Sequence, residues 1–152
     1  MEVTCRLVEA DDLPALLALV PQGERNPDAP GAQVPPPGRA RAILAAMAQA
    51  GTTFVFVATV AGEPGVAATC TLTIAPSLAY GGRPSATIET VVVATHLRGR
   101  GIGTRLIAHA VEHARAAGCY KAQLITRGRP EQVAFYRRAG FPWEGVGFKV
   151  YF

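Results

Sequence analysis

The chain has no long hydrophobic run. None of its apolar stretches approaches the ~20 residues that a helix needs to cross a bilayer. Its first residues, M-E-V-T-C-R, also lack the basic start and hydrophobic core of a signal peptide. We therefore expect no membrane association and a cytoplasmic location.

Cysteine is scarce as well. The three cysteines, Cys5, Cys70 and Cys119, are odd in number and show no C-x-x-C spacing, which favours free, buried thiols over disulfides or a metal site. His109 and His113 are four residues apart in a helical pattern, a spacing that a metal ion could use. We favour a solvated helix face there and predict no metal.

Charged residues make up only 17% of the chain, and the two signs are unevenly distributed. Residues 1–76 carry four basic and seven acidic side chains, whereas residues 77–152 carry eleven basic and four acidic ones. A basic half suits a polyanionic ligand. Nucleic acid is one such ligand, but the basic residues do not interleave with aromatic ones and no nucleic-acid-binding motif is present, so we expect none.

Length and periodicity predict a single domain of strands and helices. At 152 residues with 49% apolar side chains, the chain is long enough to bury one substantial core. Alternating or β-branched stretches predict strands at residues 3–8, 53–60, 66–74, 86–93 and 120–126, with one or two more within 143–152. Helical spacing predicts helices at residues 13–20, 39–50, 102–117 and 130–139. Glycines stand where the last three of these should end, at Gly51, Gly118 and Gly140.

Residues 21–38 interrupt this pattern. They hold six of the twelve prolines and three glycines, so they neither continue a helix nor join a central strand. The stretch is longer than most connections between elements. A functional flap and a plain surface linker both fit it.

The stretch at 88–118 is the one around which the rest is organised. An apolar run leads into the loop R-G-R-G-I-G at 98–103, and an amphipathic helical pattern follows. The start of a helix has N–H groups without partners and the positive end of the helix dipole, and both attract phosphate groups. Arg98 and Arg100 would add charge and forked donors. Positive φ and close approach of the backbone to the ligand would come from Gly99, Gly101 and Gly103.

Two familiar phosphate-binding motifs do not fit this loop. The pattern G-x-x-x-x-G-K-[ST] is absent, and G-x-G-x-x-G fails because Leu106 stands where the third glycine should be. The pattern that fits is R-x-x-G-x-G, from Arg98 to Gly103. Further along, residues 133–141 read V-A-F-Y-R-R-A-G-F, a helix that carries F-Y and is closed by G-F. In this order, the two features resemble the GNAT-type N-acetyltransferase superfamily.

This resemblance implies a fold class and an acyl donor. The fold class is α/β (α+β), with one domain over residues 1–152 and a mixed, mostly antiparallel sheet of about six or seven strands flanked by about four helices. The donor is acetyl-CoA, with its diphosphate on the loop and its pantetheine amides along the strand edge. An Asn that many members carry before the last helix is missing, since residues 126–129 read T-R-G-R. The residues expected to hold acetyl-CoA are Val91, Val93, Arg98, Gly99, Arg100, Gly101, Ile102, Gly103 and Thr104.

Acetyl transfer to an amine requires a neutral amine and benefits from a proton for the departing thiolate. Glu89 is the candidate base because it is a lone acid in an apolar strand, where burial would favour its taking a proton. The alternative is a salt bridge, for example to Arg127. The resemblance makes Tyr136 the candidate acid, with core packing as the alternative.

The predicted function is acetyl-CoA-dependent N-acetylation of a primary amine on a small molecule or peptide. Direct attack in a ternary complex is expected, since no cysteine lies in a plausible nucleophile setting. A non-catalytic acyl-CoA-binding regulatory module is the alternative. The residues do not identify the acceptor, and we allow for a homodimer.

Overall fold

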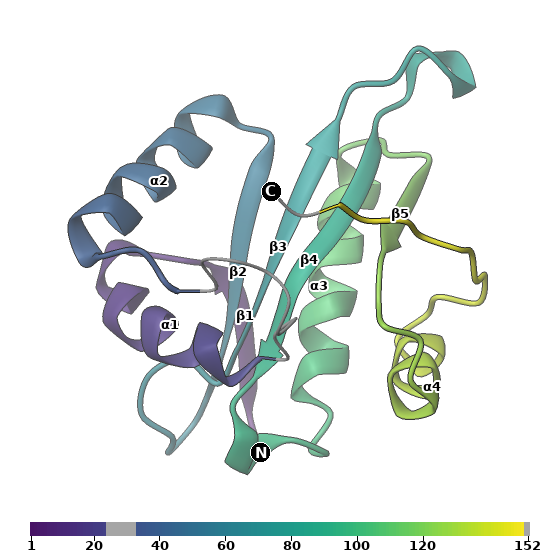
Figure 1. Ribbon diagram of the computed structural model, residues 1–152. Coiled ribbons are helices and arrows are strands. Elements are labelled where there is room, and N and C mark those ends of the chain that lie inside the picture. Colours follow the sequence, from purple (N-terminus) through teal and green to yellow (C-terminus); the bar gives the residue numbers. More distant parts are fainter. Residues whose placement is uncertain (24–32, 151–152) are drawn as a thin grey trace.

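The computed structural model describes residues 1–23 and 33–150 (Figure 1). Residues 24–32, within the proline-rich stretch, and residues 151–152 lie outside the described part. Half of the stretch on which the choice between a flap and a linker depends, nine of its eighteen residues, therefore lies outside it. Among the described helices, none has the length and apolar character needed to cross a membrane.

The sheet has five strands whose spatial order is their chain order. The first four are antiparallel neighbours, and the fifth pairs with the fourth in parallel. This mixed, mostly antiparallel sheet confirms the predicted fold class. The strands are β1 (Val3–Leu7), β2 (Thr53–Val60), β3 (Ala68–Ala75), β4 (Ser85–Val93) and β5 (Lys121–Leu124).

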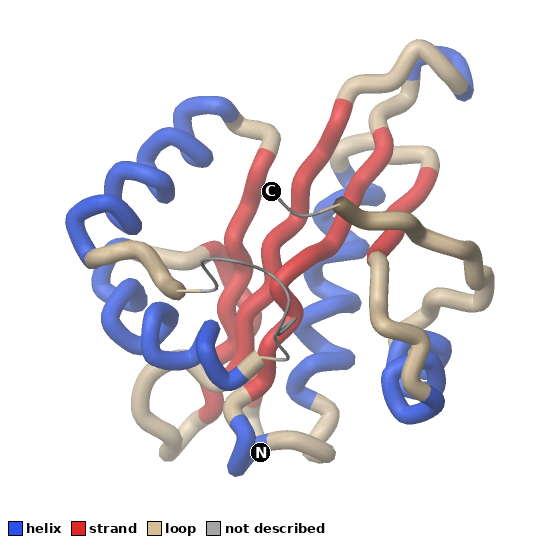
Figure 2. Tube along the Cα trace, in the orientation of Figure 1, coloured by secondary structure: helices blue, strands red, loops and turns tan. Residues whose placement is uncertain are grey.

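Four α-helices surround this sheet (Figures 1 and 2). Helices α1 (Leu13–Leu19) and α2 (Pro37–Ala50) lie together on one face. Helix α3 (Ile102–Ala116) packs on the opposite face, and α4 (Pro130–Arg138) lies beyond β5. The face of α3 that the spacing predicts is buried, through Ile102, Leu106, Ala110 and Ala114. The core therefore sits between α3 and the centre of the sheet, with a second layer under α1.

The predicted helix ends are confirmed. Gly51, Gly118 and Gly140 have φ values of 65°, 77° and 96°, a region that residues with a side chain rarely adopt. After α4, the N–H of Phe141 donates to the carbonyl of Tyr136 at 3.0 Å. This backbone bond closes the helix end and holds the candidate acid next to a tight turn.

The expected number of strands is too high. The described residues form five strands rather than about six or seven, because residues 143–150 adopt no strand. Trp143 and Phe148 are 91% and 92% exposed. Aromatic and β-branched residues favour a strand only where a partner strand takes the backbone hydrogen bonds and a face buries the side chains. Neither condition is met there.

The expected solvated face of α3 is also wrong at its two histidines. The ring of His113 lies 4.4 Å from that of Phe54, and the ring of His109 lies 5.0 Å from that of Phe56, between centroids. Both histidines are half-buried. Strand β2 presents large aromatic rings to α3, so the flat imidazoles pack on them instead of facing water.

An ion pair ties β1 to the start of α1. Both terminal nitrogens of Arg6 donate to the carboxylate of Asp12, at 2.6 and 2.9 Å. The same carboxylate accepts the N–H of Glu9 at 2.8 Å. The hydrogen bond from Arg6 holds the pKa of Asp12 below its usual value.

Replacing Asp12 with Asn should lower the free energy of unfolding at pH 7 by about 1.5 kcal/mol, since a charged hydrogen bond is lost. A lowered pKa in the native state means that the carboxylate stabilises the fold above about pH 4 and loses this effect as the pH falls further. The gap between Asp12→Asn and the parent should therefore shrink from pH 7 to pH 3 in urea denaturation. Asp11→Asn, at an exposed neighbouring carboxylate, is the matched control. An equal gap at both pH values would contradict this account of Asp12.

Candidate active site

The Arg/Gly loop joins β4 to α3 through a short 3-10 turn at Thr95–Leu97. Gly99 and Gly101 have φ values of 77° and 78°. Gly101 is the N-cap of α3, gives no side-chain hydrogen bond to the first turn, and no acidic residue lies in that turn. The start of α3 therefore presents its N–H groups and the positive end of its dipole to an anion.

Gly103 serves this loop in a different way from the one expected. It is part of α3 and has no positive φ, so that expectation is wrong for Gly103 and right for the two glycines before it. A Cβ on Gly103 would lie 3.1 Å from Val93 Cγ2 and 3.2 Å from Phe135 Cζ. The missing side chain allows α3 to lie close to both β4 and α4.

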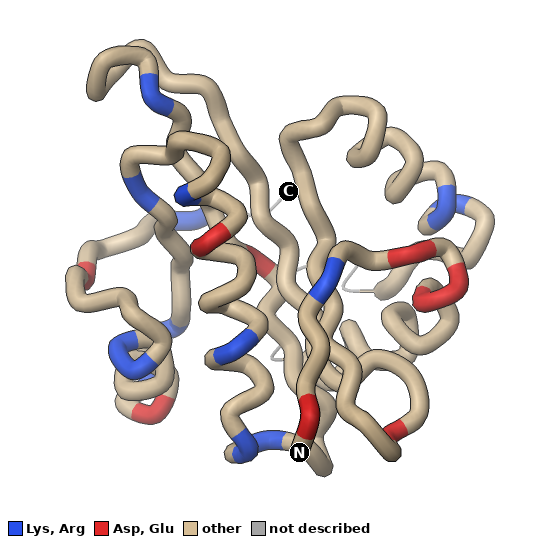
Figure 3. Tube along the Cα trace, turned by 180° about the vertical axis from the view of Figure 1, so that it is seen from behind, with Lys and Arg blue, Asp and Glu red and all other residues tan. Residues whose placement is uncertain are grey.

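Arg98 uses its side chain within the protein. Its Nε donates to the carbonyl of Val93 at 3.1 Å, and its Nη2 donates to the carbonyl of Gln22 at 2.7 Å. Two of the donors that the sequence assigned to phosphate thus bridge two backbone segments. Arg100 is exposed and lies outside the cavity described next. Figure 3 shows basic residues both on this loop and on α4.

A cavity of about 500 Å³ lies between the end of β4, the start of α3 and α4. Arg129 and Arg138 line it and add positive charge to that of the helix start. We call it the donor cavity, after the acyl donor that the sequence analysis predicts for this region. Of the nine residues predicted to hold acetyl-CoA, all but Arg100 line it, namely Val91, Val93, Arg98, Gly99, Gly101, Ile102, Gly103 and Thr104.

The donor cavity exists because β4 and β5 part. Their pairing ends at Ile88 and Leu124, whereas β4 continues to Val93. The last part of β4 therefore faces no β5 partner, and such an edge can pair with an extended ligand that carries amides. The carbonyl of Val93 already accepts a hydrogen bond from Nε of Arg98, so a ligand amide that donates to this carbonyl would share it with Arg98.

A β-bulge in β4 lies at the same place. Thr69 and Thr71 of β3 face Val92 and Glu89, so one residue of β3 opposes two of β4. Thr90 has a φ of 51°, which is unusual for a β-branched side chain. The bulge redirects β4 between its paired half and its open half.

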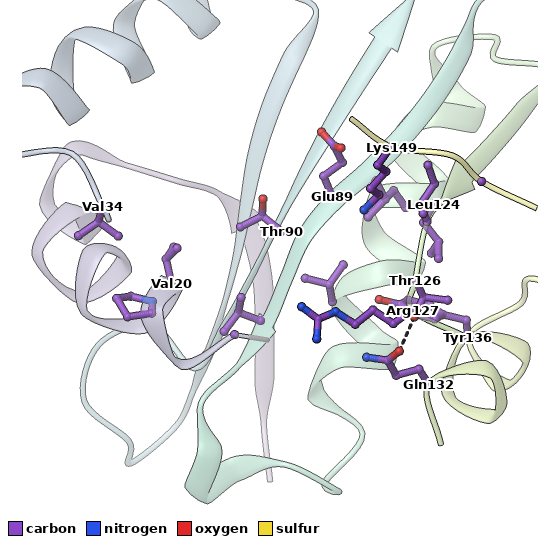
Figure 4. Close-up of a pocket in the computed structure, with 17 residues that line it drawn as sticks. Val20, Val34, Glu89, Thr90, Leu124, Thr126, Arg127, Gln132, Tyr136 and Lys149 are labelled. Carbon is purple, nitrogen blue, oxygen red and sulfur yellow. Dashed lines mark hydrogen bonds between the residues drawn. The ribbon is translucent and has the colours of Figure 1, made fainter. Parts of the chain in front are cut away.

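A second cavity, of about 650 Å³, lies on the other side of this open edge. In Figure 4, Glu89 and Lys149 lie at one end of it, and Arg127, Gln132 and Tyr136 lie at the other. The hydroxyl of Thr126 donates to Oε1 of Gln132 at 2.6 Å, the contact drawn as a dashed line. We call this the acceptor cavity, after the amine acceptor expected from the sequence.

Glu89 lines the acceptor cavity but is exposed, so the expectation that it is buried is wrong. The reason is the parting of the strands, since β5 stops covering β4 just before this residue. Within residues 1–23 and 33–150, no ion pair involves Glu89. The alternative role as a salt-bridge partner of Arg127 is therefore not found there.

Tyr136 stands where the two cavities meet. It is half-buried, and its ring lies 4.9 Å from that of Phe135 and 6.4 Å from that of Phe141, between centroids. It therefore packs in the protein and also faces both cavities. Five residues line both of them, namely Gly23, Val91, Val92, Gln132 and Tyr136.

Only some of the residues that line these cavities were named from the sequence, and three of the others come from different parts of the chain. Gly23 comes from the proline-rich stretch, Gln132 from the first turn of α4 and Lys149 from the C-terminal segment. Gly23 lies in the stretch for which a functional flap is one interpretation, although nothing marks this residue individually. Nothing in the local pattern at Lys149 indicates a site. Gln132 had one available signal, because it lies one turn before the F-Y pair on the same helix.

Comparison with known proteins agrees with this geometry. Residues 24–141 match the acetyltransferase (GNAT) family. That is most of the chain, so the protein belongs to this family of acyltransferases. A putative acetyltransferase from Agrobacterium tumefaciens str. C58 superposes with a TM-score of 0.80 at 38% identity, covering 97% of this chain and 98% of the other.

Two further relatives carry a more specific name. The probable glucosamine 6-phosphate N-acetyltransferase 2 of Oryza sativa subsp. japonica is 39% identical over 92 residues, 60% of this chain and 54% of that protein. The chain spans about half the length, or less, of the curated relatives it matches. The structure of glucosamine-6-phosphate N-acetyltransferase from Arabidopsis thaliana has a TM-score of 0.86 over 100% of this chain and 99% of the other. At 20% identity it shows a shared fold.

Proposed function

We propose that this protein transfers the acetyl group of acetyl-CoA to a primary amine by direct attack in a ternary complex. The observation that carries the proposal is the pair of cavities that meet at Val91, Val92 and Tyr136. One cavity has the helix start and arginines that suit a diphosphate, and the other has a carboxylate that suits an amine. A donor and an acceptor bound in them would meet at the open edge of β4.

In this proposal each candidate residue has one role. The amine nitrogen attacks the thioester carbonyl carbon, the C–S bond breaks, and the sulfur leaves as a thiolate. Glu89, directly or through a water molecule, takes the proton that the nitrogen loses. Tyr136 gives its phenolic proton to the thiolate. Its position at the junction of the cavities supports this role.

The cysteines support direct transfer. No cysteine lines either cavity among the residues that the structure describes. Cys70 is buried, and burial raises the pKa of its thiol to about 12, so it stays protonated at neutral pH. The cysteines therefore offer no suitable nucleophile for a covalent acyl-enzyme intermediate. Free thiols also suit the reducing cytoplasm in which we propose that the protein works.

The alternative is a regulatory module that binds acyl-CoA without turnover. Glu89→Gln and Tyr136→Phe distinguish the two functions, because both groups act mainly in the transition state. Each variant should lower kcat by about tenfold or more and leave the Kd of acetyl-CoA nearly unchanged. Turnover is followed by thiol release, and the Kd by calorimetry. Glu112→Gln and Tyr120→Phe, at residues that line neither cavity, are matched controls.

Full turnover in both site variants would rule out these roles. No turnover in the parent, with intact acetyl-CoA binding and a panel of amines, would favour the regulatory module instead.

We also propose that the acceptor is a small amine with an anionic group. The curated relatives are named for glucosamine 6-phosphate, which carries both an amine and a phosphate. Arg127 and Lys149 line the acceptor cavity together with Glu89. Two cations and one carboxylate match a phosphate and an ammonium group on the same molecule.

Arg127→Gln and Lys149→Gln should each raise the KM for glucosamine 6-phosphate by about tenfold, because an ion pair with phosphate is lost. The KM for glucosamine, which has no phosphate, should change little. Lys121→Gln, at an exposed lysine outside both cavities, is the control. Equal effects on both amines would contradict a phosphate subsite.

A homodimer remains a proposal, supported by the C-terminal segment. Val146, Phe148 and Val150 are exposed there, and among the described strands β5 is an edge strand. A second copy would cover these apolar side chains. Light scattering should give twice the chain mass of 15.9 kDa. A monomer at all concentrations, or a dimer unaffected by Phe148→Asp, would exclude this interface.

A further inference from the structure

The turn that follows α1 is hydrogen-bonded to the loop that precedes α3. A 3-10 turn at Val20–Gln22 follows α1 and brings Gln22 beside Thr95. Oε1 of Gln22 accepts the N–H of Thr95 at 3.0 Å and its hydroxyl at 3.3 Å. The carbonyl of Gln22 accepts Nη2 of Arg98 at 2.7 Å. We call these contacts the Gln22–Arg98 clasp.

The clasp joins distant parts of the chain. Gln22 and Arg98 are separated by 76 residues, and Arg98 also holds the carbonyl of Val93 at the end of β4. A planar guanidinium can bridge two carbonyls in this way because its donors point in fixed, different directions. Arg98 thereby links three elements: the turn after α1, the end of β4 and the Arg/Gly loop.

Gly23 makes the same junction tight. A Cβ on Gly23 would lie 2.7 Å from Val92 Cγ2, which is too close for a real contact. Its φ of −69° is ordinary, so space rather than backbone conformation excludes a side chain. Gly23 lines both cavities, and Val20 and Pro21 just before it line the acceptor cavity.

We propose that Gln22 and Arg98 are positioning residues that set one wall of the acceptor cavity relative to the loop that binds the acyl donor. This inference rests on the proposed function. Gln22 is exposed and lines neither cavity, so it acts only through the backbone that it holds. With the clasp closed, the wall formed by residues 20–23 keeps a fixed distance from the open edge of β4. Acceptor and donor are then presented to each other in one geometry.

The clasp also predicts linkage between the two ligands. Acetyl-CoA bound at the Arg/Gly loop would order that loop together with Arg98. Because Arg98 donates to the carbonyl of Gln22, the wall of the acceptor cavity formed by residues 20–23 would be ordered as well. Binding in one cavity then favours binding in the other by the same factor in both directions. Loss of the clasp should remove this coupling while leaving the start of α3 intact.

Gln22→Ala tests the clasp, since it removes the acceptor of the Thr95 bonds from an exposed position. It should raise the KM for glucosamine 6-phosphate by roughly fivefold, the size expected for lost hydrogen bonds. The Kd of acetyl-CoA, measured without acceptor, should stay within about twofold, because the donor cavity keeps its own residues. Gln22→Glu keeps an oxygen acceptor at the same place and should restore the parent KM.

A readout without turnover separates this inference from the proposed function. Hydrogen exchange at the Thr95 amide should be about tenfold or more faster in Gln22→Ala and close to the parent rate in Gln22→Glu. Unchanged exchange in Gln22→Ala would overturn the clasp whether or not the protein acetylates amines. If the parent protein acetylates no amine but the exchange pattern is as expected, the proposed function is refuted and the clasp is supported.

The kinetic result decides the role of the clasp. Two results for Gln22→Ala would show that the clasp does not position the wall formed by residues 20–23. One is an unchanged KM for the acceptor, and the other is a KM that rises in step with the Kd of acetyl-CoA. As a second variant, Gly23→Ala should raise the same KM through its clash with Val92, and Gly23→Ala/Val92→Ala should recover part of it, with Val92→Ala alone as control.

Discussion

The open start of α3 is the constraint on which the rest of the structure depends. A helix normally covers its first N–H groups with the side chain of its N-cap. Here the N-cap is Gly101, in a left-handed conformation, and it leaves those groups uncovered. An uncovered helix start beside a cavity is costly unless water or a ligand satisfies it. The arginines that surround the cavity favour a ligand with negative charge.

The parting of β4 from β5 gives this helix start its ligand-sized space. Five residue positions of β4, from Glu89 to Val93, continue beyond the pairing with β5. The bulge at Thr90 turns the strand where the two cavities meet. Tyr136 and Gln132 of α4 close the gap from the far side. The parting of the two strands and the bulge together create the donor cavity, the acceptor cavity and their junction.

Much of this arrangement could be predicted from the sequence because it depends on local patterns. Helix spacing marks the buried face of α3, and glycine marks the left-handed ends of α2, α3 and α4. The order of strand, Arg/Gly loop and helix predicted a phosphate-binding region, and eight of the nine residues predicted for it line one cavity. These features depend on neighbours in the chain, so a sequence window contains their cause.

The remaining features depend on tertiary contacts. The positive φ of Thr90 goes against the preference of a β-branched residue, so no local rule predicts the bulge. Glu89 looked buried because its strand is apolar, yet the neighbouring strand ends beside it. Arg98 looked like a phosphate ligand, but its partners are carbonyls that only the fold brings together. Residues 143–150 have strand-forming composition without a partner strand among the described residues.

The central claim is that the start of α3 holds the diphosphate of the acyl donor. Calorimetry with the folded protein tests it most directly, by comparing acetyl-CoA with S-acetylpantetheine, which keeps the thioester and both amides but has no phosphate. The account predicts saturable binding of acetyl-CoA and an affinity for S-acetylpantetheine that is about a hundredfold lower or undetectable, since the charged contacts are lost. Equal affinity for the two compounds, or no binding of acetyl-CoA, would contradict it.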